Sequence, residues 1–170
     1  LNSMLVSISK EEKKIKFLEV LDHSLIKEFN LDSFPRQLEI NLDNEVVLVS
    51  MENNNIFIDY KSQLTLVRKF DIINDNKINE YSINDFGISR NANWLICITS
   101  TDKSLRIFDI ISTNLIEWVM FEKIPLSISL SPNSLYLAMS FMEAKGIYLY
   151  INRTMFVDLE DVEEIKEPIH

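Results

Sequence analysis

The sequence predicts an all-β fold made of repeated four-stranded units. Short apolar segments rich in Ile, Val, Phe and Tyr alternate with small polar turn clusters, and the pattern recurs at spacings of 41, 49 and 42 residues. Regularly spaced short strands are typical of a β-sandwich, a barrel or a propeller. Only a propeller requires successive units to resemble one another at a period of about 40–45 residues. We therefore expect β-propeller blades, about four of them, forming an incomplete propeller.

The expected strands are about five to seven residues long. They include VVLVSM (46–51), NIFIDY (55–60), WLICIT (94–99), LRIFDI (105–110), LYLAMSF (135–141) and GIYLY (146–150). The chain has only 2 Gly but 16 Asn, and Asn tolerates the left-handed backbone of tight hairpins. The segments 46–51 and 94–99 are almost continuously apolar, which predicts strands buried on both faces.

The repeat is visible in three windows that align without a gap. They are KIKFLEVLDHSLIKEF from Lys14, NIFIDYKSQLTLVRKF from Asn55 and SLRIFDIISTNLIEWV from Ser104. Each has the pattern of strand, polar turn and strand. A separate match at an offset of 42 relates four residues to four others, namely Ser89, Asn91, Trp94 and Leu95 to Ser131, Asn133, Tyr136 and Leu137.

These matches predict blades over approximately 1–30, 31–73, 78–121 and 122–151, within a partial propeller of residues 1–157. Residues 158–170 are acidic and contain Pro168, so we expect an exit tail or a linker there. Four blades do not normally close a ring of this type. The chain is therefore expected to self-associate through exposed blade edges.

Composition limits the classes of function. The formal net charge is -9, so the chain lacks the broad basic surface of a duplex-binding protein. A single cysteine, Cys97, cannot form an internal disulfide, which fits a reducing compartment. No charge-free apolar run approaches the ~18 residues of a membrane span, and the N-terminus lacks the order of a signal peptide. Because it does not begin with Met, the sequence is expected to be part of a longer protein.

The third unit resembles a WD repeat. Phe108-Asp109 takes the place of the Trp-Asp pair, and Asp102 takes the place of the Asp in the turn between the second and third strands. In the WD-repeat family this Asp holds its hairpin through local hydrogen bonds. Leu18-Glu19 and Tyr150-Ile151 stand at the Trp-Asp place in other units, so these units have lost the marker.

A longer series of motifs resembles the U3 small nucleolar RNA-associated WD-repeat subunits of the UTP-B subcomplex, at the end of their second propeller. It runs LRIFD (105–109), LIEW (115–118), SISLSPNSLYLA (127–138), GIYLY (146–150) and NRTMF (152–156). The correspondence covers residues 83–157 and is weaker over 1–82. The resemblance implies that six residues are structural repeat positions and not ligand sites, namely Asp102, Phe108, Asp109, Ser131, Pro132 and Gly146.

This resemblance implies a non-enzymatic scaffold of the nucleolar small-subunit processome that supports pre-rRNA processing. Its partners would be other UTP-B and processome proteins, with U3 RNA or pre-rRNA contacted indirectly, and it would need no cofactor, metal or membrane. The alternative is a generic WD-repeat adaptor that binds peptides in another complex. A hydrolytic propeller enzyme is the third possibility.

The sequence contains few residues of the types that commonly act in catalysis. Of the two histidines, His23 falls in an expected exposed turn and His170 is the last residue. Cys97 lies between two isoleucines, which favours a buried, inert thiol. One Cys and two His cannot form the usual zinc sets, and Gly87 and Gly146 are too few for a phosphate-binding loop.

The remaining candidates have structural explanations. Asp102, Asp109 and Glu117 fall at repeat positions, which disfavours a pair of glycosidase carboxylates. A basic stretch, Lys10, Lys13, Lys14 and Lys16, is interrupted by two glutamates and is expected to be a solvated hairpin edge, with RNA phosphate contact as the minority interpretation. Trp94, Trp118, Phe121, Phe141 and Met142 are expected in the core, although the last three could belong to an interaction face.

Overall fold

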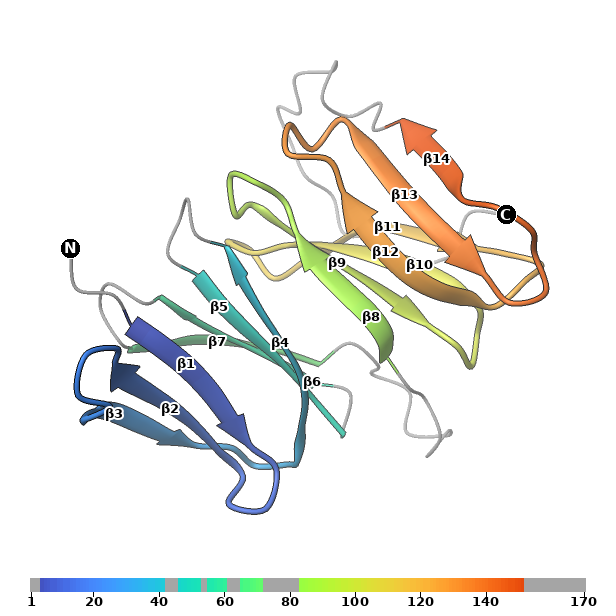
Figure 1. Ribbon diagram of the computed structural model, residues 1–170. Helices are drawn as coiled ribbons and strands as arrows, with labels where there is room; N and C mark the ends of the chain where they lie inside the picture. Colours follow the sequence, from blue (N-terminus) through green and yellow to red (C-terminus); the bar gives the residue numbers. More distant parts are fainter. Residues whose placement is uncertain (1–3, 42–45, 53–54, 61–64, 72–82, 152–170) are drawn as a thin grey trace. The chain divides into compact units, whose positions relative to one another are not determined.

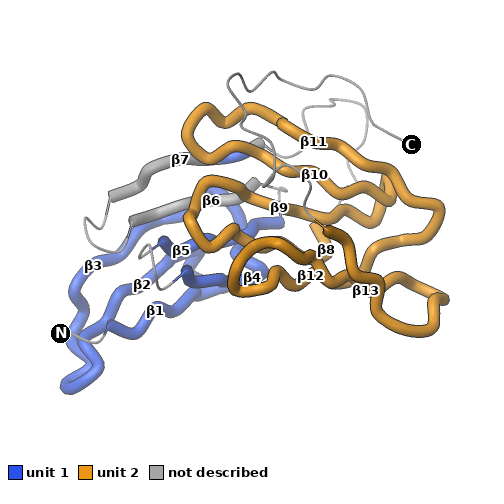
Figure 2. Tube along the Cα trace, turned by 90° about the horizontal axis from the view of Figure 1, so that it is seen from above, with its two compact units in different colours: residues 1–74 blue, residues 75–170 orange. Residues whose placement is uncertain are grey.

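The computed structural model describes residues 4–41, 46–52, 55–60, 65–71 and 83–151 (Figure 1). These residues form fourteen strands in four antiparallel sheets, and no described residue is helical. The all-β prediction is therefore confirmed. The chain divides into two compact units, Leu1–Asn74 and Asp75–His170 (Figure 2).

The first unit contains two sheets. The strands β1 (Met4–Ser9), β2 (Lys14–Glu19) and β3 (Leu25–Asn30) form one sheet in the order β1-β2-β3. The strands β4 (Pro35–Asn41), β5 (Val46–Met51), β6 (Asn55–Tyr60) and β7 (Thr65–Asp71) form the other, in the order β4-β5-β6-β7. Each strand pairs with the one that follows it in the chain, so each sheet is a meander of hairpins.

The core of the first unit lies between these two sheets. Ile15 and Phe17 on β2 pack with Val47, Val49 and Met51 on β5. Every residue of β5 is buried, as its continuous apolar sequence predicts, because a strand covered on both faces has no solvent side to fill with polar residues.

The second unit repeats this plan. The strands β8 (Ile83–Ile88), β9 (Trp94–Thr99), β10 (Ser104–Asp109) and β11 (Leu115–Met120) form a four-stranded sheet in the order β11-β10-β9-β8. The strands β12 (Pro125–Leu130), β13 (Tyr136–Phe141) and β14 (Tyr148–Ile151) form a three-stranded sheet in the order β12-β13-β14. Ile96, Ile98 and Leu105 pack against Met139 and Phe141 between these sheets.

Polar bonds hold the first strands of these two sheets together. Ser127 Oγ and Ile128 N both donate to Asp85 Oδ2, at 2.7 Å and 2.9 Å. Asn84 Nδ2 donates to the carbonyl oxygen of Pro125 at 2.7 Å. Because β8 and β12 begin their sheets, the two sheets are joined along one side.

The hairpins carry the repeat at the level of the backbone. The register shifts between Phe17 and Leu18, between Ile58 and Asp59, and between Ile107 and Phe108, at corresponding places in the three aligned windows. Left-handed residues also recur at matching turns, in the pairs Lys13 and Lys103, His23 and Thr113, and Ala92 and Ser134. Non-glycine residues take this conformation, which is how a chain with 2 Gly makes so many tight turns.

Sheets spanning Met4–Asn30, Pro35–Asp71, Ile83–Met120 and Pro125–Ile151 make up the described fold. The assignment of residues 1–157 to a single partial propeller stays a prediction. The expected exit tail, 158–170, lies outside the described residues. Within the part of the chain that the structure describes, no helix is long and apolar enough to cross a membrane.

Candidate functional site

Asp102 organises the hairpin between β9 and β10. Its Oδ1 accepts hydrogen bonds from the hydroxyls of Thr99 and Ser104, the latter at 2.7 Å. Its Oδ2 accepts one from Arg106 Nη2 at 2.5 Å, and the Arg106 side chain is only 8% exposed. Both carboxylate oxygens are thus used inside the blade. The arrangement is that of a structural anchor.

The guanidinium of Arg106 is also covered by an aromatic ring. Its Cζ lies 4.7 Å from the centroid of Trp118 on β11, in a cation–π contact. The indole Nε1 of Trp118 is buried and has no hydrogen-bond partner among the described residues. Arg106 on β10 therefore contacts the β9–β10 turn through Asp102 and β11 through Trp118.

Phe108 and Asp109 end β10. Phe108 is buried, whereas the carboxylate of Asp109 accepts hydrogen bonds from both N and Oγ of Ser112, each at 2.6 Å. The turn is closed further by Thr113 N donating to the backbone oxygen of Asp109 at 2.8 Å. Asp109 thus shapes the turn between β10 and β11, a role that Asp side chains commonly fill.

Ser131 and Pro132 belong to the turn between β12 and β13. The Ser131 hydroxyl bonds to Asn133 Oδ1 at 2.7 Å and accepts a hydrogen bond from Tyr136 N at 2.9 Å. The turn between β8 and β9 has the same bonds at the same distances, with Ser89, Asn91 and Trp94 in these places. Pro132 follows Ser131, a turn position for which its restricted φ is suited.

Gly146 lies just before β14 with φ of 103°, a conformation that residues with a side chain rarely adopt. A Cβ at this position would meet no atom within 4 Å. The backbone conformation, and not lack of space, is therefore what requires glycine here.

The residues considered for catalysis are placed as follows. Cys97 is buried, and this burial raises the pKa of its thiol to about 12, so it is an inert core residue as predicted. His23 is exposed in the turn between β2 and β3, also as predicted, whereas His170 lies outside the described residues. Within the described ranges, no group of three or more His, Cys, Asp or Glu side chains is placed to hold a metal ion.

The basic stretch at Lys10–Lys16 lies on the hairpin of β1 and β2, and its lysines have local partners. Lys10 pairs with Glu52 at 3.3 Å, Lys14 pairs with Glu28 at 2.7 Å, and Lys16 pairs with Glu12. Lys13 Nζ lies 4.3 Å from the centroid of the Phe34 ring. This is the predicted hairpin edge, and neutralised lysines are poor candidates for phosphate contact.

Aromatic residues at the strand ends divide between core and surface. Phe141 is buried, and its ring packs edge-on against Phe121 at 5.1 Å and Tyr148 at 5.3 Å. Met142 is 44% exposed, so the expectation that it lies in the core is wrong. It follows the last residue of β13, where the sheet that covers Phe141 ends. Trp94 and Trp118 are half-buried.

A cavity of about 300 Å³ opens between the two sheets of the second unit. One wall comes from β9, β10 and β11, and the other from β12, β13 and β14. The lining is largely apolar, with two tyrosines and one carboxylate: Ile96, Leu105, Ile107, Glu117, Val119, Phe121, Leu130, Ser134, Tyr136, Leu137, Met139, Tyr150 and Ile151.

The strand count explains the position of this cavity. In the four-stranded sheet, Ile107 on β10 pairs across from Glu117 on β11, and both line the cavity. The facing sheet has three strands, with β14 at its edge. Among the described residues, no strand follows β14 to lie opposite β11. Among the strands that the structure describes, the face of β11 that carries Glu117 and Val119 is therefore partly uncovered.

Glu117 is the charged residue of the lining. No hydrogen bond or ion pair to its carboxylate is found among the described residues, and burial raises the pKa of this carboxyl above its ordinary value of 4.5. A glycosidase would need a second carboxyl group facing it across the cavity, and the lining contains none. The site is thus suited to binding an apolar group that carries a positive charge.

The fold identifies the architecture to which these sheets belong. The chain is similar to the crystal structure of the Cps50 (Swd1) β-propeller domain of Myceliophteria thermophila, with a TM-score of 0.73 and 16% identity, over 88% of this chain and 50% of that chain. The fold is that of β-propeller blades. No family model matches the chain.

A curated relative adds information at the level of sequence. The chain is 28% identical over 156 residues to WD repeat-containing protein 36 of Homo sapiens, a match that covers 92% of this chain and 16% of the relative. The chain thus spans only a small part of that relative's length. The sequence is thus similar to part of a WD-repeat protein, and the structural similarity is one of fold.

The cavity and Glu117 were not foreseen as a binding site. One signal is present in the aligned windows, where Glu117 stands at the place of Lys27 and Arg68. This reversal of charge at a repeat position marks a residue that the repeat alone does not explain. That Glu117 faces a cavity depends on the packing of two sheets, which no single window contains.

Proposed function

We propose that the chain is a non-catalytic protein-interaction scaffold of the nucleolar small-subunit processome, acting with U3 RNA in pre-rRNA processing. The observation that carries the proposal is the ordered series LRIFD, LIEW, SISLSPNSLYLA, GIYLY and NRTMF, which resembles the U3-associated UTP-B subunits. The propeller fold and the similarity to WD repeat-containing protein 36 agree with it. The partners proposed are other UTP-B and processome proteins, with RNA contacted indirectly.

The geometry supports the non-catalytic part of the proposal. The carboxylate of Asp102 is bonded to Arg106, and that of Asp109 is bonded within its turn. Glu117 is the one carboxylate on the cavity wall. Acid–base hydrolysis of a glycoside needs two carboxyl groups across a cleft, so these three residues do not form such a site.

Affinity purification of the full-length protein from nucleolar extract tests the proposal. We expect co-purification of UTP-B proteins and enrichment of U3 RNA over an unrelated small nucleolar RNA. Treatment of the extract with ribonuclease should leave the protein partners bound, since the RNA contact is proposed to be indirect. Recovery of neither UTP-B proteins nor U3 RNA would overturn the proposal.

The second candidate function is a peptide-binding adaptor of another complex. The cavity beside β14 favours it, because an apolar pocket next to an edge strand is a common place for an extended peptide. A cytoplasmic location of the full-length protein, together with a reproducible peptide ligand, would favour this adaptor over the nucleolar scaffold.

A further inference from the structure

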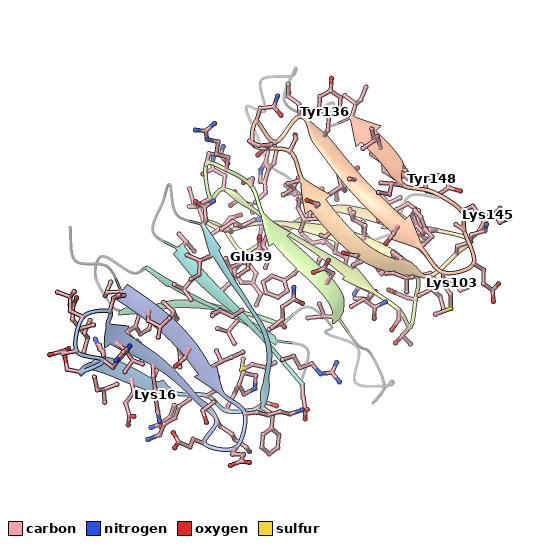
Figure 3. All side chains as sticks on the ribbon, in the orientation of Figure 1. Lys16, Glu39, Lys103, Tyr136, Lys145 and Tyr148 are labelled. Carbon is pink, nitrogen blue, oxygen red and sulfur yellow. The ribbon has the colours of Figure 1, made fainter. Side chains whose placement is uncertain are left out.

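The outer edge of β14 and the cavity next to it form one continuous surface, which we call the β14 site. It comprises the edge of Tyr148–Ile151 and the cavity walls at Glu117, Val119 and Phe121. Tyr136 and Tyr148 lie toward opposite ends of the β13–β14 pair (Figure 3). An edge strand presents N–H and C=O groups to which another strand can bond.

The side chains show which face of an added strand would enter the cavity. Tyr150 lines the cavity, and its ring lies 6.1 Å from that of Phe121. Tyr148 pairs across from Met139, a core residue of the same interface. Successive side chains of a strand point to opposite faces. In a strand added to β14, alternate side chains would therefore lie over Glu117 and Val119.

The neighbouring sheet shows what an added strand would resemble. In that sheet β10 corresponds to β14, since Leu105 and Ile107 correspond to Ile147 and Leu149 at an offset of 42. The strand β11 pairs with β10, so it occupies the position that a strand added beside β14 would take. Arg106 on β10 corresponds to Tyr148 and lies across from Trp118. A strand added to β14 would therefore pair with it as β11 pairs with β10.

The chemistry of the cavity selects the side chain that enters it. Apolar residues cover most of the wall, which favours aliphatic carbon. Glu117 supplies a carboxylate for which no cation is found among the described residues, and Tyr136, Tyr150 and Phe121 supply aromatic rings. A guanidinium can satisfy a carboxylate and stack on aromatic faces at the same time, whereas an ammonium forms a compact point charge. The net charge of -9 also attracts basic segments at long range.

We propose that the β14 site binds an extended peptide segment of a partner protein, which adds a strand to β14 and places an arginine in the cavity against Glu117. The segment alternates apolar or basic residues, which face the cavity, with polar residues that face away. This proposal rests on the protein-interaction function above, which the scaffold and the adaptor share, and it names the chemistry of a partner segment. Purified components test it, so its failure would leave the processome association to be judged by affinity purification.

A fluorescent peptide with the sequence Thr-Val-Thr-Arg-Thr-Val-Thr is the probe, and anisotropy is the measurement. We expect saturable binding, and binding about tenfold weaker when norleucine replaces the arginine. The same peptide with N-methyl groups on the residues that bond to β14 should not bind, since it cannot donate to the strand edge. Equal affinity of the arginine and norleucine peptides, or no binding of either, would overturn the proposal.

A protein variant distinguishes a specific charge contact with Glu117 from nonspecific binding of the peptide. In Glu117→Gln the arginine peptide should bind about tenfold more weakly, while the affinity of the norleucine peptide should stay unchanged. Glu122→Gln is the control, because Glu122 is not part of the cavity wall and should leave both affinities unchanged. An equal loss for both peptides in Glu117→Gln would contradict a direct arginine contact.

Hydrogen exchange identifies any other occupant of the β14 site. Amides of β14 that face outward should exchange rapidly in the free chain and slowly with the arginine peptide bound. Protection without peptide at every protein concentration would mean that the chain itself covers the edge. Protection that appears only at high protein concentration would mean that a second copy covers it. Either result would overturn the proposal.

Discussion

Asp102 shows how one side chain can determine the structure of a blade. It binds Thr99, Ser104 and Arg106 at once, and the Arg106 guanidinium is 8% exposed. A charge so deeply buried is tolerated when it is paired and hydrogen-bonded. Removal of the Asp102 carboxylate would take away the anion that balances this buried charge, which costs more than the pair itself contributes.

We therefore expect Asp102→Ala to destabilise the chain by about 3 kcal/mol, since it removes the carboxylate that balances the buried Arg106 guanidinium. Urea denaturation followed by circular dichroism measures this. Glu28→Gln is the control, because it breaks an exposed pair with Lys14, and exposed pairs contribute little. Similar stabilities of Asp102→Ala and Glu28→Gln would show that the Asp102 network is not a structural anchor.

Glu117, unlike Asp102, lowers the stability of the folded chain when it is ionised. Burial raises its pKa in the folded chain above the ordinary 4.5, so the folded state favours the protonated carboxyl. The stability that this protonation provides is fully present below the unfolded pKa and is lost as the pH rises through the folded pKa. At neutral pH the ionised carboxylate is thus a cost to the free protein.

Glu117→Gln should accordingly be more stable than the wild-type chain at pH 7, because glutamine carries no charge to desolvate. The difference should shrink as the pH falls from 7 toward 4.5, because the Glu117 carboxyl then becomes protonated in the folded chain and no longer carries a charge to desolvate. Urea midpoints measured between pH 4 and pH 8 test this. A difference that does not change with pH would contradict the assignment of the effect to ionisation.

At the scale of elements, the two sheets of the second unit are joined at β8 and β12 and separated at β11 and β14. Asp85 makes the joint, since Ser127 Oγ and Ile128 N both donate to its Oδ2. On the other side, β11 faces a sheet whose described edge is β14. The cavity lies on this unjoined side, which gives it an opening.

Asp85→Ala should loosen β12 more than β9 or β10. The amide of Ile128 loses its acceptor, so we expect hydrogen exchange at β12 to accelerate about tenfold, while exchange at the central strands stays unchanged. Asp109→Ala is the matched control, because the bonds of its carboxylate lie within a turn and its effect should be limited to the amide of Ser112. Equal acceleration in every strand would indicate global destabilisation.

At the scale of the whole molecule, exposed apolar residues on β14 are the clearest surface for self-association. Leu149 is 70% exposed and Ile151 is 62% exposed. Leu149 alternates with Tyr148 and Tyr150, so it points away from the cavity, to the face that a further blade would cover. A second chain can cover this face without bonding to the outer edge of β14, which the β14 site uses.

We expect the purified chain to self-associate with increasing concentration, and Leu149→Lys to weaken this association at least severalfold, because it places a charge on the contact face. Leu21→Lys is the control, since Leu21 is 91% exposed and lies in a turn, not in an edge strand. Multi-angle light scattering measures the molecular mass of the wild-type chain and of each variant. A wild-type monomer at high concentration would refute self-association.

Much of the fold can be predicted from the sequence because its strands are local. The segments 46–51, 55–60 and 94–99 are the observed β5, β6 and β9, since β-branched and aromatic runs between Asn-rich turns leave few alternatives. Each sheet also pairs strands that are consecutive in the chain. Met142 was misplaced because it follows the last residue of a strand, where the sheet no longer covers it.

The sequence alone determined the strands, their turns, the repeat and the inert environment of Cys97, because each depends on neighbours within one hairpin. Only the tertiary structure decided that Arg106 is buried between Asp102 and Trp118, and that Glu117 faces a cavity. These facts depend on pairing within a blade and on the packing of one sheet against the next. Glu117 lies in a regular strand, and its place in the interface between sheets, not its place in the repeat, makes it part of a cavity wall.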